Sequence, residues 1–152
     1  MQYKILINAG WWLLSLLLLV ACAGTRAPVD DSDLRLQAAS KAFGGRYDYL
    51  IVTADGLWAD QAAVEMSRVI GPNQLSRDLA SRLLQAAAHP VRILVSGHNR
   101  QKTLQVIRDA FSFTQGQRLT QLEFLFLGNP DDAQKLRPLV EAVGGRFRFA
   151  AF

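Results

Sequence analysis

Four short runs of apolar, β-branched and aromatic residues recur along the chain, and a segment with helical spacing separates each run from the next. The runs occupy residues 47–53, 91–95, 122–127 and 146–152. The helical segments are 58–70, the stretch from Asn73 to His89, and the stretches that follow Asn99 and Asn129. Strands separated by helices require crossover connections, which build a parallel sheet with helices packed on it. We therefore predict a single small α/β domain of about four mainly parallel strands.

The hydrophobic pattern also predicts which strands are covered. The run Tyr49–Val52 and the runs at 91–95 and 122–127 are apolar at successive positions, as strands buried on both faces are. The last run, Arg146–Phe152, alternates arginine with phenylalanine at its start. We expect the first three strands to be covered and the last strand to lie at an edge of the sheet.

The N-terminal segment differs in composition from the rest of the chain. Lys4 precedes an apolar stretch that is interrupted by Asn8 and Gly10 and closes on Leu19-Val20-Ala21-Cys22. A membrane span needs about 20 apolar residues. Here the stretch is shorter and ends in small residues, as a cleaved signal peptide does. We predict that residues 1–21 are a signal peptide, with an uncleaved signal anchor as the alternative.

The four residues Leu19-Val20-Ala21-Cys22 resemble the lipobox of bacterial lipoproteins. The resemblance implies that Cys22 becomes the first mature residue and carries a diacylglyceryl group on its thiol. Two or more acyl chains give stable attachment, so membrane lipid is an expected partner and the cell envelope the expected location. Ala23 after the cysteine resembles the outer-membrane lipoproteins, which face the periplasm. Residues 22–33 would then form a lipidated tether, and residues 34–152 the α/β domain.

Composition narrows the functions open to this domain. The chain contains one cysteine, so it can form no intramolecular disulfide and no cysteine-based metal cluster. Its net charge is +4, and its arginines are scattered rather than gathered into the basic stripe that nucleic-acid binding needs. No Gly-x-Gly-x-x-Gly or Walker sequence follows any strand. We therefore expect no nucleic-acid partner, no cofactor and no metal.

Polar residues follow each of the first three predicted strands. Asp55, Ser96, His98 and Asp131 would meet at one rim if these strands are neighbours, because ligands of parallel sheets bind beyond the carboxyl ends of the strands. Serine, histidine and aspartate could perform acyl transfer, and histidine with two carboxylates could hold a metal. The same residue types also serve as helix caps and turns. We expect no catalytic site and keep these four residues as candidates for a small hydrolase or metal site.

The stretch Leu79–His98 resembles the second strand of OmpA-like peptidoglycan-binding domains and the helix that precedes it. The resemblance centres on Val91-Arg92-Ile93-Leu94-Val95-Ser96-Gly97-His98. In that family a Thr-Asp pair follows the Gly-His pair, and the aspartate helps to hold diaminopimelate. Here Asn99-Arg100 follows, so the aspartate of the binding motif is missing.

These observations predict a non-catalytic lipoprotein of the cell envelope whose domain binds another envelope protein or assists the assembly of a complex. The predicted edge strand Arg146–Phe152 is the expected docking surface, because a sheet edge can accept another strand. The alternative is a divergent peptidoglycan-binding lipoprotein. A hydrolase or metal site at the Asp55/His98/Asp131 rim ranks below both.

Overall fold

A computed structural model describes residues 31–53 and 57–152 of the chain. The predicted signal peptide, Cys22 and most of the predicted tether lie outside these residues. The elements are α2 (Ser32–Phe43), β1 (Asp48–Val52), α3 (Leu57–Ile70), α4 (Gln74–Leu84), a 3-10 turn (Gln85–Ala87), β2 (Val91–Gly97), α5 (Arg100–Ser112), β3 (Leu122–Gly128), α6 (Pro130–Ala142) and β4 (Arg146–Ala151). Helix α2 begins at Ser32, so the last two residues of the predicted tether belong to the folded domain. Within the described ranges, no helix is long and apolar enough to cross a membrane.

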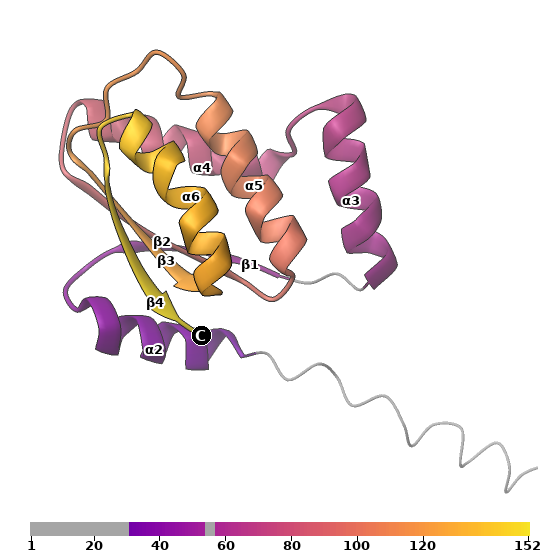
Figure 1. The fold of residues 1–152 in the computed structure, drawn as a ribbon, viewed down its shortest axis with the longest axis horizontal. Coiled ribbons are helices and arrows are strands. Elements are labelled where there is room, and N and C mark those ends of the chain that lie inside the picture. Colours follow the sequence, from indigo (N-terminus) through magenta and orange to yellow (C-terminus); the bar gives the residue numbers. More distant parts are fainter. Residues whose placement is uncertain (1–30, 54–56) are drawn as a thin grey trace, which may run out of the picture. The chain divides into compact units, whose positions relative to one another are not determined.

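The four strands form one sheet in the order β1-β2-β3-β4, and all three pairs are parallel. This confirms the predicted α/β domain with a mainly parallel sheet. Because crossover connections are right-handed, strands that follow one another in a single direction place all their connecting helices on the same face. Figure 1 shows the consequence, with α4, α5 and α6 side by side across one face of the sheet.

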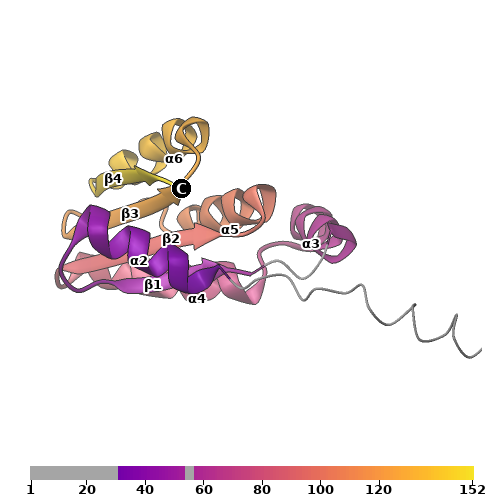
Figure 2. The same cartoon turned by 90° about the horizontal axis from the view of Figure 1, so that it is seen from below.

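Two hydrophobic clusters fill the spaces on either side of the sheet. The larger cluster joins α4, α5 and α6 to strand residues such as Ile93, Phe124 and Phe147. The smaller cluster joins α2, through Ala39 and Phe43, to the other face of β2 and β3. Figure 2 shows α2 on the face opposite α5 and α6. The apolar pattern of the two central strands is explained because helices cover them on both faces.

Helices α4, α5 and α6 each begin at an asparagine side chain. The Oδ1 atoms of Asn73, Asn99 and Asn129 accept hydrogen bonds from backbone N–H groups in the first turns of α4, α5 and α6, at 2.9, 3.0 and 2.9 Å. Each bond satisfies a donor that the helix leaves without a partner. At the other end of α6, Gly144 has a φ of +82°, which glycine adopts without the strain that a Cβ introduces.

The prediction for the sheet edges is half right. β4 lies at an edge, as the alternation in Arg146–Phe152 predicts. β1 lies at the other edge, so the prediction that it is covered is wrong. Asp48 and Tyr49 are exposed, and Leu50 and Ile51 are only half-buried. Coverage of a strand depends on its place in the sheet, and a short apolar run does not determine that place.

Candidate functional site

The sequence predicts that the four candidate residues lie at the edge formed by the carboxyl ends of the strands. The structure has three of the four there. The strands end at Val52, Gly97, Gly128 and Ala151. Asp55 lies outside the described residues. Ser96, His98 and Asp131 lie on or shortly after β2 and β3, which are neighbours in the sheet. The condition on which the sequence argument depended is therefore met for these two strands.

Ser96 is buried on the face of the sheet that α2 covers. Its Oγ donates a hydrogen bond to the carbonyl oxygen of Leu127 and accepts one from Nη1 of Arg35, both at 2.9 Å. Arg35 belongs to α2, and its guanidinium also lies over the ring of Phe152 at 4.3 Å from the centroid. The serine hydroxyl therefore ties α2 to the end of β3.

Asp131 and His98 occupy different surroundings. Asp131 is in the first turn of α6, on the opposite face of the sheet from Ser96, and its side chain is 73% exposed. His98 is half-buried, and its backbone N–H donates to the carbonyl oxygen of Val52 at 3.0 Å. Its ring Nδ1 lies 3.4 Å from the same oxygen. Ser96 and Asp131 therefore do not converge, because their side chains lie on opposite sides of the sheet.

Two ion pairs hold the carboxyl edge together, and sequence reasoning missed both. Nζ of Lys102 lies 2.9 Å from Oδ1 of Asp60 and 3.0 Å from the carbonyl oxygen of Thr53. The side chains of this lysine and aspartate are only 9% and 2% exposed. Nδ2 of Asn99 donates to the other carboxylate oxygen of Asp60 at 3.0 Å. This cluster fixes α3 to the start of α5.

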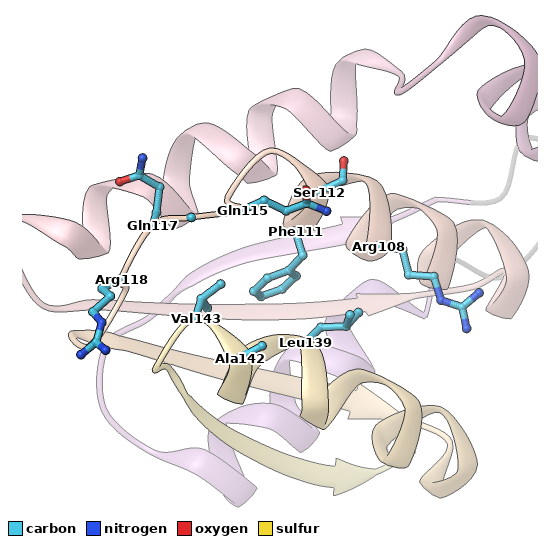
Figure 3. Close-up of a pocket in the computed structure, with 10 residues that line it drawn as sticks. Arg108, Phe111, Ser112, Gln115, Gln117, Arg118, Leu139, Ala142 and Val143 are labelled. Atoms are coloured by element: carbon cyan, nitrogen blue, oxygen red, sulfur yellow. The ribbon is translucent and has the colours of Figure 1, made fainter.

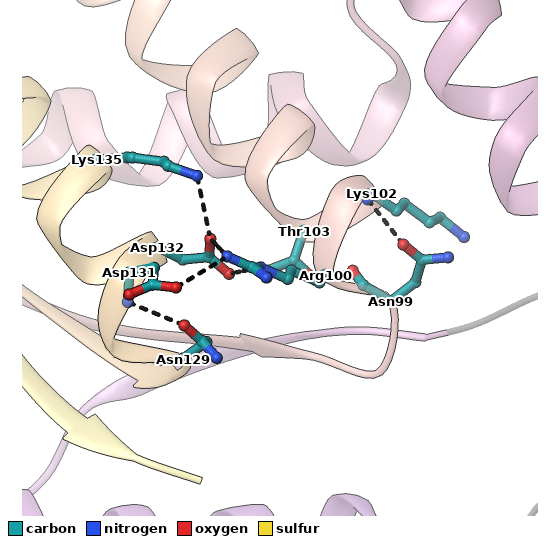
Figure 4. A network of polar contacts seen from close by, with 8 residues as sticks. All are labelled: Asn99, Arg100, Lys102, Thr103, Asn129, Asp131, Asp132 and Lys135. Carbon is teal, nitrogen blue, oxygen red and sulfur yellow. Dashed lines mark hydrogen bonds and ion pairs between the residues drawn. The ribbon is translucent and has the colours of Figure 1, made fainter.

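The second ion pair joins α5 to α6 and is drawn in Figure 4. Arg100 donates from Nε and Nη2 to the two carboxylate oxygens of Asp132, at 2.6 and 2.7 Å. This bidentate geometry is the strongest form of charge-assisted hydrogen bond in proteins. The hydrogen bond to Asp132 and the charge of that carboxylate raise the pKa of Arg100. Asp132 is buried, and Nζ of Lys135 lies 4.0 Å from its Oδ1.

One sequence signal could have revealed these pairs. Arg100 and Lys102 stand in the first turn of α5, which contains no acidic residue. Positive charge at a helix N-terminus is opposed by the helix dipole. Two basic residues at that place indicate carboxylates supplied by other elements, which here are Asp60 of α3 and Asp132 of α6.

A third charge cluster lies toward the amino ends of the strands, on the face that α2 covers. Glu123 accepts from Nε of Arg92 and, at 3.3 Å, from Nη1 of Arg148. Nη1 of Arg92 also donates to the carbonyl oxygens of Gly44 and Arg46, each at 3.1 Å. Burial raises the pKa of Glu123, but the hydrogen bonds and charges of the two arginines outweigh burial and lower it overall. The cluster clamps the C-terminal end of α2 to the sheet.

A small pocket opens at the carboxyl edge, between the start of α2 and the starts of α5 and α6. It has a volume of about 140 Å³, and Arg35, Gly97 and Phe152 contribute to its lining. Pockets for organic ligands span about 300–1,000 Å³, so this one is too small for such a ligand. Gly97 is required here because a Cβ would lie 2.0 Å from Oγ1 of Thr103. The glycine lets α5 pack directly against the end of β2.

The described residues contain no group of three or more His, Cys, Asp or Glu side chains placed to hold a metal ion. In the same part of the chain, every buried side-chain nitrogen or oxygen has a hydrogen-bond partner. No such atom therefore marks a ligand site in these ranges. The strand order adds a second observation, because ligand crevices of open parallel sheets form where the strand order reverses. The order β1-β2-β3-β4 contains no reversal.

The chain was compared with protein-family models, with curated proteins and with solved structures, and none of them matches it.

Proposed function

We propose that this chain is a membrane-anchored lipoprotein of the cell envelope whose α/β domain is a non-catalytic module that binds other proteins. The lipobox-like residues Leu19–Cys22 support the anchor. The single strongest support for the binding role is the edge strand β1, which exposes the side chain of Tyr49.

The hydrogen bonding of β1 shows which of its backbone groups are available. The carbonyl oxygen of Val52 accepts from His98, so Val52 faces β2. Because backbone groups in a parallel strand alternate in direction, Tyr49 and Ile51 direct their N–H and C=O groups away from β2. The side chain of Tyr49 is also 55% exposed. Outward backbone groups beside an exposed aromatic side chain form a template for strand addition.

The two edges of the sheet differ in how they are protected. β4 carries Arg146 and Arg148, and charged side chains on an edge strand oppose pairing with another chain. β1 carries one charged residue, the exposed Asp48 at its start, and from Tyr49 to Val52 it carries no charged residue and no proline. Strand addition is therefore favoured at β1 over β4. An envelope protein that offers an extended segment is the partner this edge fits.

The edge can be blocked without breaking the sheet. Proline at position 49 removes an N–H that points away from β2, so the β1–β2 hydrogen bonds remain. Tyr49→Thr keeps the N–H and a residue that favours strands, and it serves as the matched control. We expect a photoreactive residue at position 49 to crosslink in cells to one envelope protein. Affinity capture of that protein should be lost with Tyr49→Pro and retained with Tyr49→Thr.

A control crosslinker at exposed Gln134 on α6 should give no adduct with that protein. Equal crosslinking from positions 49 and 134, or capture that survives Tyr49→Pro in a folded chain, would contradict the proposal. Sedimentation of the chain with purified sacculi addresses the cell-wall alternative. Binding to sacculi that is unaffected by Tyr49→Pro would favour peptidoglycan over a protein partner.

The anchor has its own test. Cys22→Ser removes the only thiol in the chain, which is the acceptor for lipid. We expect this variant to accumulate as an unprocessed precursor that takes up no labelled fatty acid, whereas the wild-type chain is labelled. Fatty-acid labelling of the Cys22→Ser variant would refute the lipoprotein proposal. The test at position 49 does not depend on this result.

A further inference from the structure

An open pocket lies between the C-terminal halves of α5 and α6, away from both the carboxyl edge and β1. Its volume is about 510 Å³, within the range of about 300–1,000 Å³ that binding pockets occupy. Phe111, Leu139 and Val143 form its apolar floor, and Arg108 and Arg118 contribute to its lining. We call it the α5–α6 pocket. Figure 3 shows the two arginines at opposite ends of the apolar strip.

The walls of the α5–α6 pocket are held in place by the core. The ring of Phe111 packs edge-on against Phe124 with 5.5 Å between centroids, and Phe124 is fully buried. The backbone N–H of Leu119 donates to the carbonyl oxygen of Val143 at 2.7 Å, which fastens the loop after α5 to the end of α6. A site formed in advance loses little conformational entropy when it is occupied.

The two arginines of the pocket differ from most of the arginines on the sheet and its rim. Arg92, Arg100 and Arg148 are each paired with a carboxylate. Arg108 and Arg118 are exposed, and neither forms an ion pair or a side-chain hydrogen bond with any of the described residues. No acidic side chain lines the pocket. The pocket therefore presents uncompensated positive charge on both sides of an apolar floor.

We propose that the α5–α6 pocket is a docking site for an acidic amphipathic segment of a partner protein, with apolar side chains on the floor and a carboxylate at each arginine. This rests on the proposed function, because it assumes that the domain binds proteins, but it uses a different surface. A lipid or fatty acid with one carboxylate would engage only one of two cations at opposite ends of the floor. A peptide segment can present two carboxylates separated by apolar residues, as segments bound in helix-lined grooves do.

The probe for this site is a random-peptide phage library selected on the full chain in detergent. Peptides are then synthesised with a fluorophore, and their binding is measured by fluorescence anisotropy. We expect selected peptides to carry two acidic residues on either side of apolar ones. The double variant Arg108→Glu, Arg118→Glu should weaken their binding about tenfold or more, since two attractive contacts become repulsive. Ala142→Gln, at an exposed position in the lining, should also weaken it by filling the pocket.

The matched control is Arg77→Glu on α4, an exposed arginine outside the pocket that forms no ion pair among the described residues. It should leave binding unchanged. Equal weakening by Arg77→Glu would overturn the proposal in favour of general electrostatic attraction. Selected peptides without acidic residues, or no selected peptide at all, would also overturn it. The proposal would also be overturned if palmitate displaces the peptide and this displacement requires only one of the two arginines, because that is the behaviour of a fatty-acid site.

The two proposals can fail separately. Tyr49→Pro should leave binding of the selected peptides unchanged, because β1 lies outside the α5–α6 pocket. Peptide binding that is lost with Tyr49→Pro would assign the peptides to the sheet edge. Thermal unfolding of each variant, followed by circular dichroism, separates loss of binding from loss of folding.

Discussion

The buried ion pair between Lys102 and Asp60 offers the sharpest test of how the carboxyl edge is held together. Replacing one partner leaves the other charge in a site where the side chains are only 9% and 2% exposed. Breaking a buried pair in this way costs about 3–5 kcal/mol. Here the cost should fall to about 2–3 kcal/mol, because each group keeps a neutral partner. Lys102 keeps the Thr53 carbonyl, and Asp60 keeps the Asn99 amide.

The double replacement separates the pair interaction from the burial. Apolar residues of similar size in place of both charges are close to neutral in many proteins. Here the double variant should still cost about 2 kcal/mol, because the Thr53 carbonyl and the Asn99 amide lose their charged partners. We expect Lys102→Met and Asp60→Leu to cost about 2–3 kcal/mol each. The resulting coupling energy would be about 3 kcal/mol. Urea unfolding followed by circular dichroism gives all four free energies of unfolding.

Two outcomes would refute this reasoning. Single variants that cost less than about 1 kcal/mol would show that solvent screens the pair as it screens surface pairs. Additive costs in the double variant would show that Lys102 and Asp60 act through separate neighbours. Arg137, whose pair with Glu141 is more than half exposed on both sides, is the matched surface control. Arg137→Met should cost clearly less than Lys102→Met.

Two further predictions concern the ends of the sheet. Gly97→Ala should lower the melting temperature and the free energy of unfolding, because its Cβ would lie 2.0 Å from Oγ1 of Thr103 and 2.9 Å from Cβ of Val52. Thr103→Ser keeps the hydroxyl oxygen and should not rescue it, whereas Thr103→Ala should rescue it in part, because the contact with Val52 remains. The pKa of Glu123 is lowered in the folded chain, so its contribution to stability is present above its ordinary pKa of 4.5 and is lost as the pH falls from there through the lowered value. Glu123→Gln should therefore lose less stability than the wild-type chain on acidification below about pH 4.5. The measurement is the slope of the free energy of unfolding against pH. An unchanged slope would contradict the ion-pair cluster.

The sequence allowed the elements and the class of the fold to be predicted because the relevant signals are local. Apolar spacing acts within a few residues, and the structure has strands at the four predicted runs and helices α3 to α6 over the predicted helical stretches. The arginines of the last strand correctly indicated an edge. The edge position of β1 was missed because a short apolar run such as Tyr49–Val52 looks the same in a central strand and in an edge strand.

The candidate site was harder to predict because it depends on side-chain direction and on partners distant in the chain. Ser96 and Asp131 both lie near the carboxyl ends of neighbouring strands, as the sequence indicates. Their side chains nevertheless lie on opposite faces of the sheet. Asp60 reaches Lys102 across 42 positions, and no local pattern links them. The one usable signal was indirect, namely basic residues where the dipole of α5 disfavours them.

The strand order connects the fold to the proposed role. A sheet in which every connection runs to the same face has no point where neighbouring connections diverge, so it opens no crevice of the kind that holds ligands in doubly wound sheets. At the carboxyl edge, the ion pairs Lys102–Asp60 and Arg100–Asp132 join neighbouring helices. Elsewhere on the domain, β1 exposes the side chain of Tyr49, and the α5–α6 pocket exposes two arginines that form no ion pair with any described residue. Such surfaces suit the recognition of another chain, which is why we propose that this domain binds proteins and place its tests at Tyr49 and at the two pocket arginines.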